Sequence, residues 1–276
     1  MTLLLVTADD YALTEGISRG VIKAHRGGLV TGTSVLALGP AFERCMPWLL
    51  EEANLDIGVH LAAVGEDPPL LSSAEIPTLV DRRGRLPTSW KHFLARWRSI
   101  DAADLHRELS AQIARISGMG VAPTHLDAHQ HLQLVPGFAS VVIDLAQSWQ
   151  IAVVRVPGSH RRTPMGVSIR ALSRQLGKSV RRNDLTTTEA FAGLDSAGSM
   201  DHDRLCHALR VLARSGVASA ELNVHPGLER DPERHRYDWR YNWGQELAAL
   251  TSPEVAKLAE NLGLRPGRRA DLISSG

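Results

Sequence analysis

The sequence predicts an α/β protein built on one largely parallel sheet, open or closed into a barrel. The main observation is that short apolar segments typical of strands alternate with helical segments about six to eight times along the 276 residues. A second observation is the hydrophobic content of 43%, which is enough to bury one large core. Neither an internal repeat nor a linker divides the sequence, so we expect a single domain spanning residues 1–276.

The first half begins with a continuously apolar run at residues 3–7, the pattern of a strand buried on both faces. Thr14 is the expected N-cap of the helix that follows. Residues 65–90 are polar, rich in proline and without a clear period, which is typical of a lid or substrate-binding loop. The elements expected here are strands at 3–7, 29–38 and 55–61 and helices at about 15–26, 41–53, 90–97 and 105–116.

The second half continues the alternation. Residues 124–133 read as a strand, which Pro136 and Gly137 then break. A hydroxyl N-cap followed by Pro253 marks the start of the last expected helix. Residues 231–243 form a charged, aromatic loop. The elements expected here are strands at 124–133, 151–156, 184–191 and 217–224 and helices at about 136–147, 165–176, 202–215 and 253–261.

The strand at 124–133 carries an unusual polar pattern, because every second position is a histidine or an aspartate: His125, Asp127, His129 and His131. Successive side chains of an extended strand alternate between its two faces, so all four are expected to point the same way. Imidazole and carboxylate groups together are common ligands of a borderline divalent ion such as zinc. A surface strand that happens to be rich in histidine is the alternative.

Polar side chains also follow the other predicted strands, at their carboxyl ends. In an α/β barrel this is the face on which active sites are built. Taken singly, a histidine such as His60 is more often a hydrogen-bonded core residue than a ligand. The groups expected to meet at one rim come from five strands: Asp9, Asp10, His60, Asp127, His129, His131, Arg155 and His225.

Charge and cysteine content exclude several classes of protein. Lys plus Arg number 31 and Asp plus Glu number 30, so there is no broad basic field to attract nucleic acid or an anionic membrane. Cys45 and Cys206 form no disulfide framework, and the apolar N-terminus lacks the basic flank of a signal peptide. No apolar run reaches the length of a membrane span. We therefore expect a soluble cytoplasmic protein, and a homodimer only on base rates.

Two histidines and a carboxylate from separate strands would leave coordination positions open on a bound metal ion. Water would take one of them, and the ion would lower its pKa toward neutrality. A second carboxylate outside the metal shell could accept the proton, and a distant histidine could protonate a leaving amine. Ligand type favours zinc, cobalt or nickel over magnesium.

Four motifs occur in a fixed order: TADDY at 7–11, GVHL at 58–61, HLDAHQH at 125–131 and HPG at 225–227. Each motif is short, but the ordered set is specific and resembles the YdjC-like carbohydrate deacetylase family, which includes chitooligosaccharide deacetylases. The resemblance extends from residue 3 to about 262 and includes PTLVDRRG at 77–84 and ELAALTSPEV at 246–255.

The resemblance implies a distorted (β/α) TIM-like barrel and one divalent metal ion, held by Asp10, His60 and His129. It implies that Asp9 is the general base and His225 the general acid. The implied reaction removes an N-acetyl group from an acetylated amino sugar and leaves acetate and a free amine. Zinc is the preferred ion, although the family is also described with magnesium. The sugar could be a chitooligosaccharide, a monosaccharide, or an intermediate of lipid or antibiotic synthesis.

The remaining polar residues receive supporting roles from the same resemblance. His131 either lies just outside the metal shell or exchanges roles with His129. Asp127 would orient a ligand histidine or hold the strand end. Arg155 would fix Asp9 electrostatically, by analogy with related deacetylases. Family members usually carry Phe-Gly after the paired aspartates, so the phenol of Tyr11 could face the substrate here.

Two other functions remain open at this point. A metal-dependent phosphoesterase would share the ligands but needs basic groups directed at a phosphate, for which Arg155 and the pair at 161–162 are candidates. The tryptophan-rich loops suit a sugar better, because CH groups stack on aromatic faces. A non-catalytic sugar- or metal-binding protein would place Asp9 and His225 far from the metal site.

Overall fold

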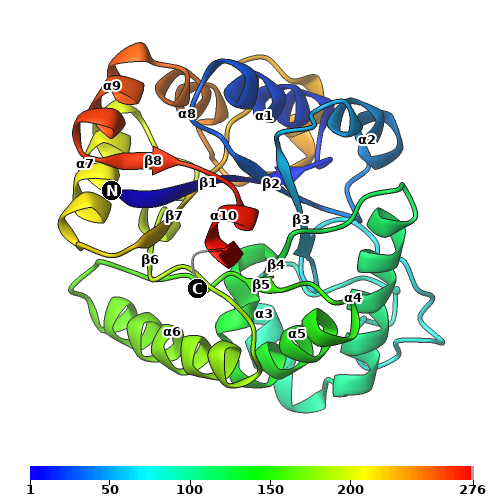
Figure 1. Ribbon diagram of the computed structural model, residues 1–276. Coiled ribbons are helices and arrows are strands. Elements are labelled where there is room, and N and C mark those ends of the chain that lie inside the picture. Colours follow the sequence, from blue (N-terminus) through cyan, green and yellow to red (C-terminus); the bar gives the residue numbers. More distant parts are fainter. Residues whose placement is uncertain (275–276) are drawn as a thin grey trace.

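The computed structural model describes residues 1–274 and contains one parallel sheet surrounded by helices (Figure 1). The strands are β1 (Thr2–Tyr11), β2 (Gly32–Val35), β3 (Asp56–Leu61), β4 (His125–Ala128), β5 (Val153–Val154), β6 (Ala190–Ala192), β7 (Ser219–Val224) and β8 (Leu264–Pro266). They lie in the order β5-β4-β3-β2-β1-β7-β6, and β8 pairs with the start of β1. The predicted parallel α/β fold is confirmed, and the last two residues of the expected domain 1–276 lie outside the described part.

The sheet curls into a distorted barrel whose closure depends on a single bridge. Val153 of β5 pairs in parallel with Thr186, which precedes β6. The backbone N–H of Thr186 donates to the carbonyl of Ala152 at 2.8 Å, and Val154 donates back to Thr186 at 3.0 Å. The strand predicted at 184–191 is therefore confirmed only at its end, where Ala190 and Phe191 belong to β6. The residues before them pair with β5 through the bridge at Thr186 and form no continuous strand.

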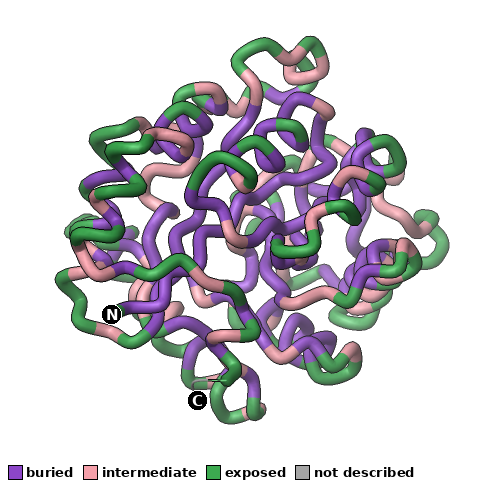
Figure 2. Tube along the Cα trace, turned by 45° about the horizontal axis from the view of Figure 1, so that its top comes forward, coloured by how far each residue is buried: buried purple, intermediate pink, exposed green. Residues whose placement is uncertain are grey.

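Helices cover the outer face of the sheet, and buried residues fill the space between the two layers (Figure 2). The helices are α1 (Glu15–Gly27), α2 (Phe42–Leu50), α3 (Trp90–Arg96), α4 (Ala102–Ser117), α5 (Pro136–Ser148), α6 (Pro164–Arg182), α7 (His202–Arg214), α8 (Trp243–Leu250), α9 (Pro253–Asn261) and α10 (Arg269–Ser274). Thr14 caps α1 as predicted, since its side chain accepts from the N–H of Ile17. None of the helices within residues 1–274 combines the length and apolar character needed to cross a bilayer.

Three elements were not predicted, namely α8, β8 and α10. All are short, and their patterns are too brief to show a period. In Figure 1, α10 (red) lies near the centre of the view, beside the ring of strands. Its residue Leu272 packs with Leu3, Leu5 and Val153 in a small apolar cluster that is separate from the main core. α10 therefore closes one end of the barrel.

The predicted strand at 124–133 is wrong beyond Ala128. β4 ends there, and the 3-10 helix η2 (His129–Leu134) follows. Gln130 and His131 have φ values of 53° and 55°, which turn the backbone out of the extended conformation. The alternation of faces stops at this turn, so His131, which lies in the turn, does not continue the row of His125, Asp127 and His129.

The segment at 65–90 contains no helix or strand before Trp90, as predicted, but it is tied to α4. The carboxylate of Glu108 accepts from the N–H groups of Leu70 and Leu71 at 3.0 Å. The N–H and hydroxyl of Thr78 both donate to Asp104 at 2.7 Å. These bonds fix the middle of the segment and leave its first residues above the barrel.

Candidate metal and catalytic site

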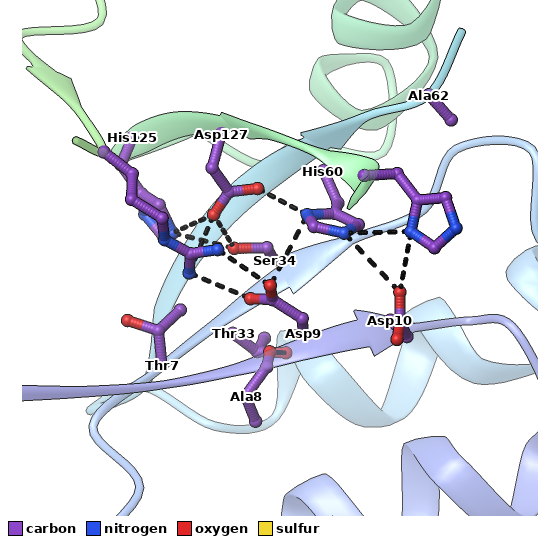
Figure 3. Close-up of polar contacts among 12 residues, drawn as sticks. Thr7, Ala8, Asp9, Asp10, Thr33, Ser34, His60, Ala62, His125 and Asp127 are labelled. Carbon is purple, nitrogen blue, oxygen red and sulfur yellow. Dashed lines mark hydrogen bonds and ion pairs between the residues drawn. The ribbon is translucent and has the colours of Figure 1, made fainter. Parts of the chain in front are cut away.

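Both aspartates at the end of β1 reach one site because the strand is irregular there. Neighbouring side chains of a regular strand point to opposite faces. The register of β1 against β2 shifts between Ala8 and Tyr11, and Asp10 has a φ of 65°. In Figure 3, the Asp9 and Asp10 carboxylates both point toward His60. Asp9 is 1% and Asp10 2% exposed, so the site lies inside the protein.

Asp10, His60 and His129 converge on one point. The Oδ1 atom of Asp10 lies 3.5 Å from Nε2 of His60 and 3.3 Å from Nδ1 of His129. The two ring nitrogens are 3.3 Å apart, and one potential ligand atom from each residue lies within 4.8 Å of the others. Oδ1 of Asp10 is buried without a hydrogen-bond partner, although buried polar atoms normally have one. Three converging donors of these types fit a divalent ion.

Asp127 supports His60 from behind. Its Oδ1 atom accepts from Nδ1 of His60 at 2.5 Å, and its Oδ2 atom accepts from the hydroxyl of Ser34 at 2.5 Å (Figure 3). This bond keeps a proton on Nδ1 and turns Nε2 toward Asp10, so a bound metal ion would displace a proton only from Nε2. Burial would lower the pKa of His60, but Asp9 and Asp127 raise it to about 9.

Arg155 holds Asp9 through two parallel bonds. Nη1 donates to Oδ2 at 2.7 Å and Nη2 donates to Oδ1 at 2.9 Å. Nη2 also lies 2.9 Å from Oδ2 of Asp127. Burial would raise the pKa of Asp9, but Arg155 and His60 outweigh it and hold the pKa below its usual range. Asp9 is therefore an oriented carboxylate whose Oδ2 atom lies 3.9 Å from Nδ1 of His60.

His225 follows β7 and lies beside a carboxylate that sequence reasoning missed. Glu246 of α8 accepts from the backbone N–H of His225 at 2.6 Å, and its Oε2 atom is 4.0 Å from Nδ1 of the ring. Nδ1 is buried without a hydrogen-bond partner. Burial raises the pKa of Glu246. The motif ELAALTSPEV contains Glu246, but nothing in its local pattern indicates that α8 brings it to β7.

The structure also places His131 and Tyr11, two further residues of the sequence prediction. His131 is absent from the cluster of Asp10, His60 and His129, and its ring packs edge-on against Phe191 at 6.1 Å. Burial lowers the pKa of His131 to about 3. Tyr11 does not face a substrate site, because it is fully buried and its hydroxyl donates to the carbonyl of Cys45 at 2.7 Å. The expectation that its phenol could meet the substrate is therefore wrong.

Aromatic residues of the 231–243 segment cover the site and form what we call the roof. Trp239 packs on the ring of His129 and Tyr241 on the ring of His225, each at 5.1 Å between centroids. The roof is tied to the first residues of the 65–90 segment. Nε1 of Trp239 donates to Glu66 at 3.0 Å, and the Tyr237 hydroxyl donates to Asp67 at 3.0 Å.

The site residues from β1, β3, η2 and β7 are those of the ordered motifs in the sequence. A family model described as YdjC-like protein matches residues 3–261. The chain belongs to this family. The YdjC-like match covers nearly the whole barrel but ends before β8 and α10.

Several curated relatives of this chain carry deacetylase names. A carbohydrate deacetylase of Geobacillus stearothermophilus is 27% identical over 260 residues, which cover 93% of this chain and 92% of that one. A chitooligosaccharide deacetylase of Salmonella dublin is 27% identical over 273 residues, covering 98% and 99%. A carbohydrate deacetylase of Brevibacillus brevis is 31% identical over a shorter region of 150 residues, 54% of this chain and 58% of that one.

The fold has a solved counterpart. A crystal structure from Enterococcus faecalis superposes with a TM-score of 0.82 at 24% identity and covers 98% of both chains. This likeness confirms the barrel architecture of the YdjC-like chain. The covered share of 98% is larger than the part of the chain that the family model matches, residues 3–261.

Proposed function

We propose that this chain is a divalent-metal-dependent deacetylase that hydrolyses the N-acetyl group of an amino sugar. The observation that carries the proposal is the convergence of Asp10, His60 and His129 beside Asp9, a carboxylate fixed by Arg155. The names of the relatives from Geobacillus stearothermophilus and Salmonella dublin agree with this chemistry. A chitooligosaccharide is the substrate to test first.

The charges inside the barrel support a divalent ion. Asp9, Asp10, Asp127 and Glu221 are four buried carboxylates, and Arg155 and Arg269 are two buried guanidiniums among them. With these groups ionised and His60 neutral, as a metal ligand would be, two negative charges remain in this set, which a divalent ion would neutralise. Two imidazoles and one carboxylate favour zinc, cobalt or nickel over magnesium. When bound, such an ion supplies Lewis-acid polarisation of the acetamido carbonyl and lowers the pKa of water.

The residues of the chain supply the proton transfers. Asp9 accepts a proton from the attacking water, and Arg155 keeps both oxygens of this carboxylate in place. His225 gives a proton to the departing nitrogen, so the C–N bond breaks to yield acetate and a free amine. Trp239 and Tyr241 offer aromatic faces next to the histidines, where the CH groups of a sugar ring could stack.

The alternatives lack such support. A phosphoesterase would direct basic groups at the substrate, but Arg155 is already engaged by Asp9, Asp127 and Glu221. Of the other two candidates, Arg161 pairs with Asp195 at 3.7 Å, and Arg162 is exposed. A purely binding protein predicts that Asp9 lies far from the metal site, whereas its Oδ2 atom is 3.9 Å from His60.

Acetate release from acetylated chitooligosaccharides, after loading with Zn²⁺, tests the proposal. Asp9→Asn is expected to lower kcat by at least about a hundredfold and to leave the metal content unchanged. Asp10→Asn is expected to lose the metal. Asp203→Asn, on the exposed surface of α7, is the matched control and keeps full activity. Near-full activity of Asp9→Asn would remove Asp9 as the base. Phosphate release from a phosphorylated sugar assayed in parallel, without acetate release from the acetylated one, would favour the phosphoesterase.

A further inference from the structure

A buried line of charged groups runs from the site down the inside of the barrel. Below Asp9 lies Arg155, whose Nε atom donates to Oε1 of Glu221 on β7 at 3.0 Å. The same Oε1 atom accepts from Nη2 of Arg269 at 2.9 Å and from the hydroxyl of Thr7 at 2.7 Å. The line therefore joins the proposed base to α10 through residues that are at most 2% exposed.

Arg269 belongs to a part of the chain that the family model does not cover. The match ends at residue 261, and α10 begins at Arg269. This arginine is nevertheless only 1% exposed, and its backbone N–H donates to Asp56 at 2.5 Å. Gly32 leaves room for it, because a Cβ atom there would lie 2.3 Å from Nη1 of Arg269. Local packing thus accommodates the guanidinium inside the barrel.

We propose that Glu221 and Arg269 are positioning residues that hold Arg155 in the orientation in which it grips Asp9. Arg155 lies between carboxylates above it, Asp9 and Asp127, and the carboxylate of Glu221 below it. Arg269 also pairs with Glu221 and partly neutralises its charge, which weakens the attraction between Glu221 and Arg155. Without Arg269, Glu221 attracts Arg155 more strongly in the low-dielectric interior, and the bonds to Asp9 weaken.

This inference rests on the proposed role of Asp9 as the base. Displacing the base by a fraction of an ångström lowers the reaction rate rather than the affinity for the substrate. Small misplacements alone can lower the rate up to about a hundredfold. Changes at Arg269 should therefore lower kcat and leave both KM and the metal content unaltered. A merely structural role would instead lower the amount of folded enzyme, which titration of active sites detects.

A set of variants separates the two roles. Arg269→Met is expected to lower kcat about tenfold or more, and Arg269→Lys to recover most of that loss because it restores the charge. Arg268→Met is the matched control, since Arg268 is exposed next to Arg269. Arg269→Met combined with Glu221→Gln should be more active than Arg269→Met alone, because the neutral amide no longer draws Arg155 away. Additive losses in this double variant would overturn the proposal.

Leu272→Ala tests the packing of α10 without changing any charge. The side chain of Leu272 packs α10 against Leu3 and Leu5. Leu272→Ala is therefore expected to lower the melting temperature of the protein, while kcat of the folded enzyme stays the same. If Leu272→Ala lowers kcat as much as Arg269→Met at a temperature where both are folded, the effect is structural and the inference fails.

An NMR measurement tests the inference without activity. The ¹H–¹⁵N signal of the Arg155 Nε group, assigned by its loss in Arg155→Lys, should shift and exchange faster with solvent in Arg269→Met than in Arg268→Met. An unchanged signal would overturn the positioning role. A third outcome is that the Arg269→Met change shifts the Arg155 signal while the unmodified protein releases no acetate from acetylated sugars. That combination would support the positioning role and refute the proposed function.

Discussion

Replacing Asp127 with asparagine tests how the site prepares His60 for a metal ion. The Asp127 carboxylate accepts from His60 through Oδ1 and from Ser34 and Arg155 through Oδ2. Asparagine has the same shape but only one acceptor oxygen, so it cannot accept hydrogen bonds from both His60 and Arg155. Whichever way the amide turns, one buried donor faces an NH₂ group, and the orientation of His60 is no longer fixed.

The expected cost follows from the position of Asp127. Removing the outer partner of a metal-binding histidine typically weakens metal affinity about 10- to 100-fold, which corresponds to about 1.4 to 2.7 kcal/mol. The full effect is expected here because Asp127 is completely buried and its bond to His60 is short. Competition with a chromophoric chelator measures Kd for Zn²⁺ in the parent and in Asp127→Asn.

The matched control is Asp144→Asn. Asp144 also pairs with a histidine, His106 at 3.0 Å, but Asp144 is largely exposed, His106 is partly exposed, and the pair joins α4 to α5. This change should leave Kd unaltered. A Kd for Asp127→Asn within twofold of the parent value would refute the reasoning, because His60 would then be oriented without its carboxylate.

Two further predictions concern His125 and the roof. Burial holds the pKa of His125 well below 6.5, so only the unfolded chain takes up a proton as the pH falls below that value. Below about pH 6.5, the unfolding free energy of the parent protein should then fall by about 1.4 kcal/mol per pH unit relative to His125→Gln. Urea titrations between about pH 5 and pH 8 would detect this difference. Unfolding free energies that change in parallel with pH in the two proteins would contradict it. Trp239→Ala should raise KM for an acetylated sugar about tenfold without changing Kd for Zn²⁺, since Trp239 covers His129 but is no ligand. An unchanged KM would exclude sugar stacking on Trp239.

The sequence predicted the position of a site residue correctly where that residue lies at the carboxyl end of a parallel strand. Asp9 and Asp10 end β1, His60 lies in β3 and His225 follows β7, so the parallel order alone brings them to one face. The period-two argument failed at His131, because the left-handed turn at Gln130 and His131 cannot be read from the pattern of polar residues. His129 reaches the metal cluster from the position directly after β4, just before that turn.

Other contacts depend on segments far apart in the chain. Glu246 reaches His225 only because α8 packs near the end of β7, and Asp67 meets Tyr237 across 170 positions. Arg269 reaches Glu221 through a helix of six residues, too short for its apolar period to stand out. Such contacts depend on how the elements pack and leave no local pattern in the sequence.

The placement of α10 has a consequence for the order of folding. β8 pairs with the first residues of β1, and Arg269 inserts beside Thr7, so residues 262 positions apart share one environment. Contacts between such distant residues form late, because the long loop between them has to close first. The charged interior is therefore completed only when α10 docks against β1, and until then Glu221 lacks the counter-charge of Arg269.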